Sequence, residues 1–147
     1  MALPEQFQKE NSENIFIYHY VEEMIANYGK FIKGLLDETE MTRAEIPFLI
    51  RVRFSQKTTQ KELVELFKVS EGYTAKLLRK FEDLGYITRR EDPSNRRQKI
   101  VELTDKGMKK TDELIEMIDE WERKVTSEMS DDEVMLLKSL LFKVVQS

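Results

Sequence analysis

The sequence predicts a mainly α-helical protein with a small β-hairpin, arranged as a winged helix-turn-helix between N- and C-terminal helices. Three observations support this fold class. Only five glycines and three prolines occur in 147 residues, which suits long helices with few loops. Apolar residues recur at helical spacing through most of the chain. Residues 86–103 are the exception, because β-like segments there flank the turn sequence Asp-Pro-Ser-Asn.

The N-terminal part of the chain predicts two helices. Residues 14–38 carry apolar side chains three or four positions apart, as one face of a long helix requires. A second helix should begin at Thr42, because Glu45 lies three residues on and completes a capping box, and should reach about Phe54. The polar residues 55–58 then interrupt the pattern.

The helix-turn-helix follows directly. Thr59 and Glu62 form another capping box and begin its first helix. The predicted buried side of this helix is Leu63, Val64, Leu66 and Phe67. Ser70 is a good N-cap for the second helix, which should run through Leu84 and end at Gly85, a residue suited to a left-handed C-cap. The predicted inner face of the second helix is Thr74, Leu77, Leu78, Phe81 and Leu84.

The two β-like segments, residues 86–91 and 98–103, should pair as a hairpin wing beside the second helix. We therefore predict a chain of one domain, 1–147. Within it, residues 42–103 form a winged helix-turn-helix lobe that binds DNA, and residues 14–38 and 104–146 form dimerisation helices.

Two helices should follow the wing. Thr104 caps a long helix that reaches about residue 128, and a third capping box, Ser130 with Glu133, begins the last one. Together with the first helix they carry wider apolar faces than one small domain could bury, so we expect a homodimer. Trp121, followed by the apolar residues of the last helix, favours a partner chain. The alternative is that these helices pack into one bundle within a single chain.

Charge is distributed unevenly along the chain. The net charge is −4, but residues 57–110 hold 14 Lys/Arg and 9 Asp/Glu, a local charge of +5. The rest holds 10 Lys/Arg and 19 Asp/Glu, a local charge of −9. A local basic surface attracts phosphate, while acidic flanks restrain non-specific binding. The alternative is ordinary scatter in a charge-rich protein.

The composition argues against several other functions. The chain has no cysteine, which excludes disulfides, thiolate nucleophiles and cysteine zinc sites. Its only histidine, His19, has no nucleophile motif near it, so we expect no enzyme activity, no metal and no cofactor. No apolar run approaches the roughly 20 residues of a membrane span, and the N-terminus lacks the pattern of a signal peptide. We expect a cytoplasmic protein that does not bind membranes.

The predicted DNA-reading residues lie on the outward face of the second helix of the helix-turn-helix. They are Ser70, Gly72, Tyr73, Ala75, Lys76, Arg79 and Lys80. The first turn of such a helix enters the major groove, so Tyr73, Ala75 and Lys76 should face base edges. Arg79 and Lys80 are better placed for phosphates, and Gly72 would let backbone amides approach one closely. The alternative is that these are merely solvated helix positions.

The predicted wing contacts are Arg90, Asn95, Arg96 and Arg97. A guanidinium at the wing tip suits the negative potential of a narrow minor groove. The alternative is that one arginine pairs with Asp92 or Glu91 and braces the hairpin. Our interpretation is that both occur, with one of Arg96 and Arg97 bracing and the other inserting.

Several motifs between Thr42 and Gly107 resemble the MarR (multiple antibiotic resistance regulator) family of transcription factors. They are Thr59-Gln60-Lys61-Glu62-Leu63, Val69-Ser70, Glu82-Asp83-Leu84-Gly85-Tyr86-Ile87, Asp92-Pro93-Ser94-Asn95-Arg96-Arg97 and Leu103-Thr104-Asp105-Lys106-Gly107. The family usually has aspartate where this chain has Asn95, an acid that helps to hold a wing arginine. The flanking helices match the family in length and placement only.

The resemblance implies a homodimer whose terminal helices interlock and carry two winged lobes to successive major grooves of a pseudo-palindromic site in double-stranded DNA. Half-sites would lie about 34–36 Å apart. Members of the family are most often repressors. The rivals are a winged-helix module that binds an acidic protein and a sequence-independent architectural DNA binder.

Many members of the family also bind small aromatic carboxylates or phenols between the dimer helices and the DNA-binding lobe, and then release DNA. Residues that could line such a crevice here are Tyr18, Tyr20, Tyr28, Phe31, Phe48 and Phe54, with Arg51 or Arg53 for a carboxylate. The alternative is that these aromatic residues are simply core.

Overall fold

The computed structural model describes residues 4–55 and 57–147. Its helices and strands are α1 (Ile17–Lys33), α2 (Ile46–Ser55), β1 (Thr58–Thr59), α3 (Gln60–Phe67), α4 (Glu71–Asp83), β2 (Ile87–Asp92), β3 (Asn95–Leu103), α5 (Asp105–Val125) and α6 (Asp131–Gln146), with short 3₁₀ helices at Lys9–Asn14 and Arg43–Glu45. Gln56, in the predicted polar break, lies outside the described residues. The predicted class, mainly α with a small antiparallel wing, is confirmed.

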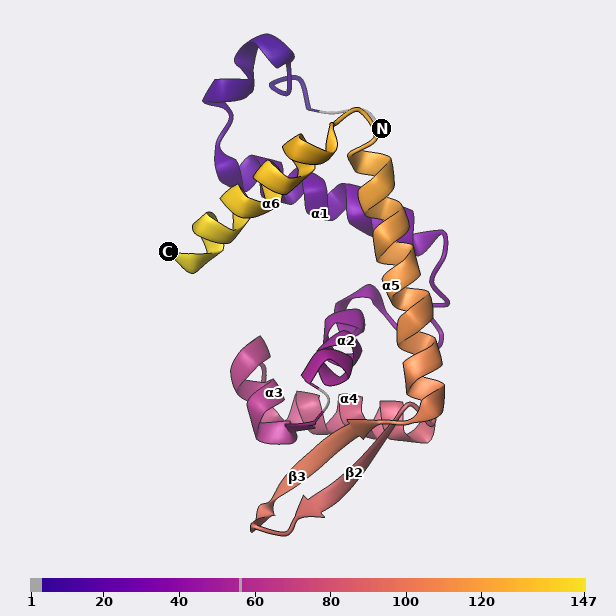
Figure 1. The fold of residues 1–147 in the computed structure, drawn as a ribbon. Coiled ribbons are helices and arrows are strands. Elements are labelled where there is room, and N and C mark those ends of the chain that lie inside the picture. The colour runs from indigo at the N-terminus through magenta and orange to yellow at the C-terminus, as the bar shows by residue number, and fades with distance from the viewer. Residues whose placement is uncertain (1–3, 56) are drawn as a thin grey trace.

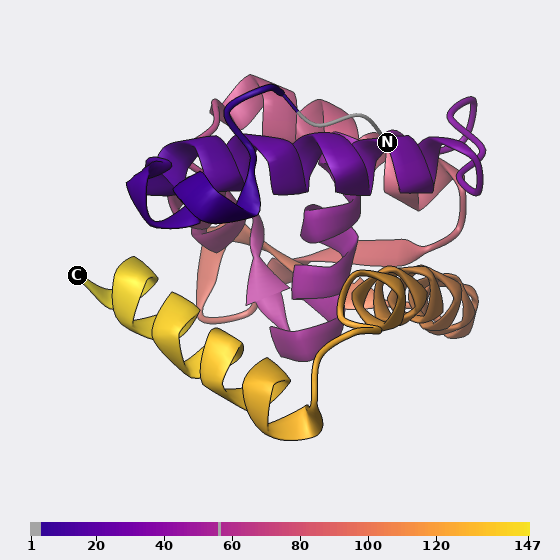
Figure 2. The ribbon, with the colours of Figure 1, turned by 90° about the horizontal axis from the view of Figure 1, so that it is seen from above.

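The elements form a lobe at one end of the molecule and a set of helices at the other. In Figure 1, α2, α3, α4 and the sheet make up the lobe, and α5 runs from the base of the wing to α1. Helix α6 turns back from the end of α5 and, as Figure 2 shows from above, runs apart from α1. No helix of the described ranges is both long and apolar enough to cross a membrane.

The first two helices differ from the prediction at their ends. The helix predicted over 14–38 is shorter, because residues 9–14 form a 3₁₀ turn and α1 ends at Lys33. The helix predicted to begin at Thr42 is preceded by a 3₁₀ turn, Arg43–Glu45, and α2 itself starts at Ile46. The capping contact predicted there is present, since the Thr42 amide donates to the Glu45 carboxylate at 2.7 Å.

The predicted N-caps of the helix-turn-helix are confirmed. The Thr59 hydroxyl accepts a hydrogen bond from the Glu62 amide at 3.1 Å, and the Ser70 hydroxyl accepts one from the Tyr73 amide at 3.0 Å. The second half of the predicted Thr59–Glu62 box is wrong, because the Glu62 carboxylate accepts from the Thr58 hydroxyl instead. Helix α4 ends as predicted, with Gly85 at φ +81°.

The wing is a three-stranded sheet in the order β1-β3-β2 rather than the predicted two-stranded hairpin. The third strand is β1, whose Thr58 and Thr59 pair with Val101 and Ile100. The predicted second strand, 98–103, begins three residues earlier, at Asn95. The turn is correspondingly tight, since the Asp92 carboxylate accepts hydrogen bonds from both the amide and the hydroxyl of Ser94.

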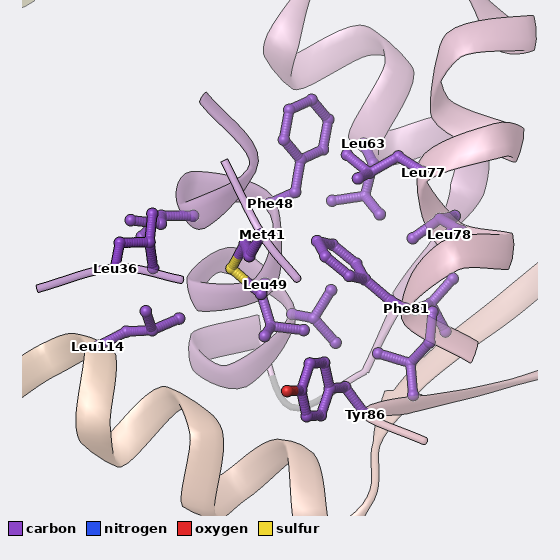
Figure 3. Packing of buried hydrophobic residues seen from close by; sticks show 14 of the residues in the cluster. Leu36, Met41, Phe48, Leu49, Leu63, Leu77, Leu78, Phe81, Tyr86 and Leu114 are labelled. Atoms are coloured by element: carbon purple, nitrogen blue, oxygen red, sulfur yellow. The ribbon is translucent and has the colours of Figure 1, made fainter. Parts of the chain in front are cut away.

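The core is formed by side chains from α2, α3, α4 and the sheet, which Leu36 after α1 and Leu114 of α5 join (Figure 3). Leu49, Leu63, Leu78 and Phe81 are completely buried there. The predicted inner face of α4 is confirmed: Thr74, Leu77, Leu78 and Phe81 are buried and Leu84 is partly buried. The predicted inner face of α3 is wrong at Leu66, which is 50% exposed.

Helix α5 joins the lobe to the terminal helices. The Thr104 hydroxyl accepts from the Gly107 amide, as predicted for an N-cap. A Cβ at Gly107 would lie 2.0 Å from the Tyr86 carbonyl oxygen, so only glycine lets α5 pass this close to the end of α4. At the other end of α5, the Trp121 indole donates to the Asn27 side chain at 2.8 Å and its ring packs edge-on against Tyr28. Trp121 therefore contacts α1 of its own chain, and the partner chain expected from Trp121 and the apolar residues of α6 stays a prediction.

Candidate nucleic-acid interface

The outward face of α4 is exposed and anchored from behind. Leu77, Leu78 and Phe81 hold the helix against the core with at most 3% of their surface exposed. Most of the predicted DNA-reading residues are exposed, namely Ser70, Gly72, Tyr73, Lys76 and Arg79. Ala75 is partly exposed. A Cβ at Gly72 would meet nothing within 4 Å, so the first turn of α4 is open to a large ligand. The first two turns of α4 are therefore open to solvent on this face.

Tyr73 occupies a defined position on this face. It is 41% exposed, and its ring lies edge-on to Phe48 with 6.0 Å between the centroids. Phe48 is itself stacked on Phe67 at 4.1 Å. The Tyr73 ring therefore packs against the edge of the core and is still partly exposed.

Lys80 differs from its neighbours on α4. Its Nζ lies 2.8 Å from a carboxylate oxygen of Glu45, and the Glu45 side chain is only 12% exposed. Burial alone would raise the pKa of Glu45, but hydrogen bonds from Lys80 and from Thr42 outweigh it and lower the pKa below the usual value. Lys80 therefore fastens α4 to the 3₁₀ turn that precedes α2. Its charge is already neutralised by Glu45.

The wing tip presents free cationic side chains. Asn95, Arg96 and Arg97 are exposed, and the Asn95 side chain accepts from the Arg97 amide at 3.2 Å. Within residues 4–55 and 57–147, neither Arg96 nor Arg97 forms a salt bridge, so the predicted brace to Asp92 or Glu91 is wrong. The asparagine in place of the family's aspartate contacts the backbone of the tip and leaves both guanidinium groups available.

The hairpin is braced nearer its base. Arg90, predicted as a DNA contact, pairs with Glu102 on the neighbouring strand at 2.9 Å. Arg89 pairs with Glu82 of α4 at 3.1 Å and also donates to the Gln60 side chain. The sequence-based prediction missed Arg89. The chain reverses at Gly85, between Glu82 and Arg89, and this reversal could have indicated that the two side chains pair. The Arg89 pair holds the wing against α4, and the Arg90 pair holds β2 against β3.

The aromatic residues proposed as an effector crevice do not converge. Phe48 belongs to the lobe core, Tyr28 packs on Trp121, and Phe54 is exposed. Arg53 is bound to α5. Phe31 alone lines a groove, of about 640 Å³ between α1 and α5, whose other walls are Asn27, Lys30, Lys124 and Val125.

Comparison with known proteins agrees with this architecture. The MarR family model matches residues 41–99. The HTH-type transcriptional regulator BilQ from Clostridium symbiosum is 29% identical over 132 residues, 90% of this chain and 91% of that protein. A crystal structure of MarR superposes with a TM-score of 0.80 at 26% identity, over 90% of each chain.

Two more distant structures share the fold. A mutant MarR from E. coli complexed with operator DNA has a TM-score of 0.72 at 22% identity, over 93% of this chain and 99% of that one. BpsR from Bordetella bronchiseptica, whose DNA binding is regulated by 6-hydroxynicotinic acid, has a TM-score of 0.72 at 15% identity, over 88% and 98% of the two chains. The similar proteins are transcriptional regulators, which agrees with the prediction that the chain is not an enzyme. Residues 41–99 thus match the MarR family of transcriptional regulators, and the chain resembles a solved MarR structure over 90% of its length.

Proposed function

We propose that the protein is a homodimeric repressor that binds a pseudo-palindromic operator in double-stranded DNA. The observation that carries this proposal is the exposed cationic face of α4 beside a wing tip whose two arginines have no salt bridge within the described residues. In the proposed complex, the first turn of α4 lies in the major groove and the wing tip reaches the adjacent minor groove.

The proposed roles of individual residues follow from their exposure. Tyr73 and Lys76 would read base edges, since they lie on the outward face of the first two turns. Arg79 would contact phosphate, and Arg96 or Arg97 would enter the minor groove. Lys80 and Arg90 receive no DNA contact in this proposal, because Glu45 and Glu102 already pair with them.

The dimer is supported by apolar surface that the single chain leaves uncovered. Helix α6 exposes apolar residues around most of its circumference, and the first half of α1 exposes several more. On α6 these are Met135, Leu136, Leu137, Leu140, Leu141, Phe142, Val144 and Val145. On and before α1 they are Phe16, Ile17, Tyr18, Val21, Met24 and Ile25. An apolar surface this extensive marks an interface. A second copy of the chain is the proposed partner, because a two-fold dimer would also place two α4 helices on successive turns of DNA.

The proposed effector is a small ligand that binds between α1 and α5. The groove between α1 and α5 has an aromatic wall, Phe31, with the Lys124 ammonium 5.5 Å from its ring centroid and Lys30 nearby. This combination suits a small anionic aromatic ligand, the chemical type of 6-hydroxynicotinic acid that regulates the distant relative BpsR. Such a ligand would release DNA only if it bound more tightly to a dimer with the wrong spacing of recognition helices.

The deciding experiment is selection of bound duplexes from a random pool by the purified protein. The proposal expects one enriched sequence with two-fold symmetry and half-sites about one helical turn apart. Similar affinity for all duplexes would instead identify an architectural binder, because base readout should favour the specific site by at least ~1000-fold. No binding to any duplex, together with capture of an acidic protein, would favour the protein-binding module.

A further inference from the structure

A hollow of about 330 Å³ lies where α3, the first turn of α4 and strand β3 meet. Its walls carry three cationic side chains, Lys61, Arg97 and Lys99. Lys61 and Lys99 were not among the predicted DNA contacts. One carboxylate, Glu71, also lines the hollow, so the net charge of the lining residues is +2.

The cations of the hollow are not neutralised by partners. Within the described part of the chain, none of Lys61, Arg97 and Lys99 forms a salt bridge, whereas Lys80, Arg89 and Arg90 nearby each do. Amide side chains of Gln60, Asn95 and Gln98 supply further hydrogen-bond donors in the same walls. None of the eight lining residues is aromatic, so the hollow offers donors for an anion but no surface on which a base could stack.

The sheet brings these residues together. Alternate residues of a strand point to the same face, so Arg97 and Lys99 share one face of β3 and Arg96 lies on the other. Strand β1 pairs with β3 through Thr59 and Ile100, and α3 begins at Gln60, directly after Thr59. This pairing places Lys61, in the first turn of α3, beside Lys99.

The position of the hollow relates it to DNA. It lies between the N-terminal turn of α4 and the wing. A duplex that receives α4 in its major groove and the wing tip in the adjacent minor groove carries one sugar-phosphate backbone between the two. That backbone must cross the junction where the hollow lies.

We propose that this hollow seats a backbone phosphate of each half-site, held by Lys61 and Lys99 with Arg97, and so fixes the register of α4 on the operator. The inference rests on the proposed function and assigns Arg97 to the phosphate, leaving Arg96 for the minor groove. Glu71 opposes the anion and limits its affinity, so that the hollow alone does not hold non-specific DNA tightly.

The test uses the full-length protein and the operator duplex obtained by selection, with single phosphates replaced one at a time by neutral methylphosphonates. For the wild-type protein, one position in each half-site should cost about fivefold in affinity at 0.15 M salt. In the Lys61→Ala/Lys99→Ala variant only Arg97 still faces this phosphate, so the same replacement should cost clearly less than in the wild type. The variant should also lower the slope of log K against log salt, by at most about 0.9 for each half-site, since Arg97 is still present.

Two further variants sharpen the test. Lys33→Ala removes an exposed charge at the end of α1, away from the wing, and should leave the phosphate position and the slope unchanged. Glu71→Gln should strengthen binding to operator and to unrelated duplexes alike. Circular dichroism is expected to show all variants folded, because Lys61, Glu71 and Lys99 are exposed. If Lys61→Ala/Lys99→Ala binds like Lys33→Ala and keeps the full methylphosphonate penalty, the phosphate seat is wrong and the operator-binding proposal stands. If the wild-type protein selects no duplex, the proposed function itself fails.

Discussion

The Arg53 guanidinium on α2 pairs with Asp112 on α5 and joins the lobe to the helix that leads to α1. The same Nη1 atom also lies 2.9 Å from the Thr111 hydroxyl and 3.2 Å from the Met108 carbonyl oxygen. The Arg53 side chain is 24% exposed, whereas that of Asp112 is 61% exposed. Arg53 therefore contributes mainly through its contacts with the buried side of α5, and less through the exposed ion pair.

We predict that Arg53→Ala lowers the free energy of unfolding by about 1–3 kcal/mol, because the variant lacks a charged donor to several acceptors at a helix junction. Asp112→Ala should cost less than about 1 kcal/mol, as exposed ion pairs do. Urea unfolding followed by circular dichroism measures both values. Arg123→Ala is the matched control, since its pair with Glu116 is exposed on both sides, and a change as large as that of Arg53→Ala would contradict the assignment.

A second prediction concerns the pH dependence of stability. Hydrogen bonds from Lys80 and Thr42 outweigh burial and lower the pKa of Glu45 below 4.5, the usual value for glutamate. A group whose pKa is lower in the folded chain stabilises it fully above the unfolded pKa, and this contribution is lost as the pH falls through the folded pKa. Glu45→Gln should therefore be less stable than the wild type at pH 7, and the difference should shrink below about pH 4.5.

Unfolding curves of the two proteins between pH 3 and pH 7 provide the measurement. Glu65→Gln changes an exposed carboxylate on α3 and should follow the wild type at every pH. A stability difference between Glu45→Gln and wild type that stayed constant down to pH 3 would show that the charge of Glu45 is not the cause.

The sequence predicted the helix ends well where the deciding contacts are local. Ser70, Thr104 and Ser130 each accept a hydrogen bond from an amide three residues on, and Gly85 has the positive φ expected of it. Such contacts are set by residues within one helical turn, so a short sequence window contains all the information they need.

The errors concern contacts between distant segments. Lys80 pairs with Glu45, 35 residues earlier, and β1 is a strand only because Thr58 lies opposite Val101. No periodicity within either segment records these pairings. The same holds for Trp121, because its position on α5 does not show that its indole donates a hydrogen bond to Asn27 of α1.

For the recognition helix, we predict that Lys76→Ala and Tyr73→Ala reduce discrimination among operator sequences more than general DNA affinity. Removing either side chain from a base edge should cost about 1–3 kcal/mol on the specific site. Tyr73→Phe separates two roles, because it keeps the ring against Phe48 and removes only the hydroxyl. Binding to matched operator and scrambled duplexes gives the comparison. Equal losses on both would mean that this face does not read bases.

For the wing, Arg96→Ala with Arg97→Ala should weaken binding to all duplexes and flatten its salt dependence by about 0.9 in slope for each phosphate that is no longer neutralised. The physical reason is that exposed guanidinium groups without salt bridges act on the backbone and groove potential. Arg90→Ala is the control within the wing, since Glu102 already neutralises Arg90. A salt slope unchanged by the double substitution, or changed as much by Arg90→Ala, would remove the wing tip from the interface.

The last prediction concerns helix α6. Leu137, Leu140, Leu141 and Val144 lie on one side of this helix and are 38–49% exposed in the single chain. If that side packs against a second copy, Leu140→Glu places a charge in the apolar interface and should shift the protein from dimer to monomer in sedimentation experiments. Operator binding should fall with it, because two linked lobes bind far more tightly than one. Ser139→Glu adds the same charge to the polar side of α6, near Lys143, and should leave the dimer intact. A protein that sediments as a monomer before any substitution would show instead that the apolar side of α6 is not a dimer interface.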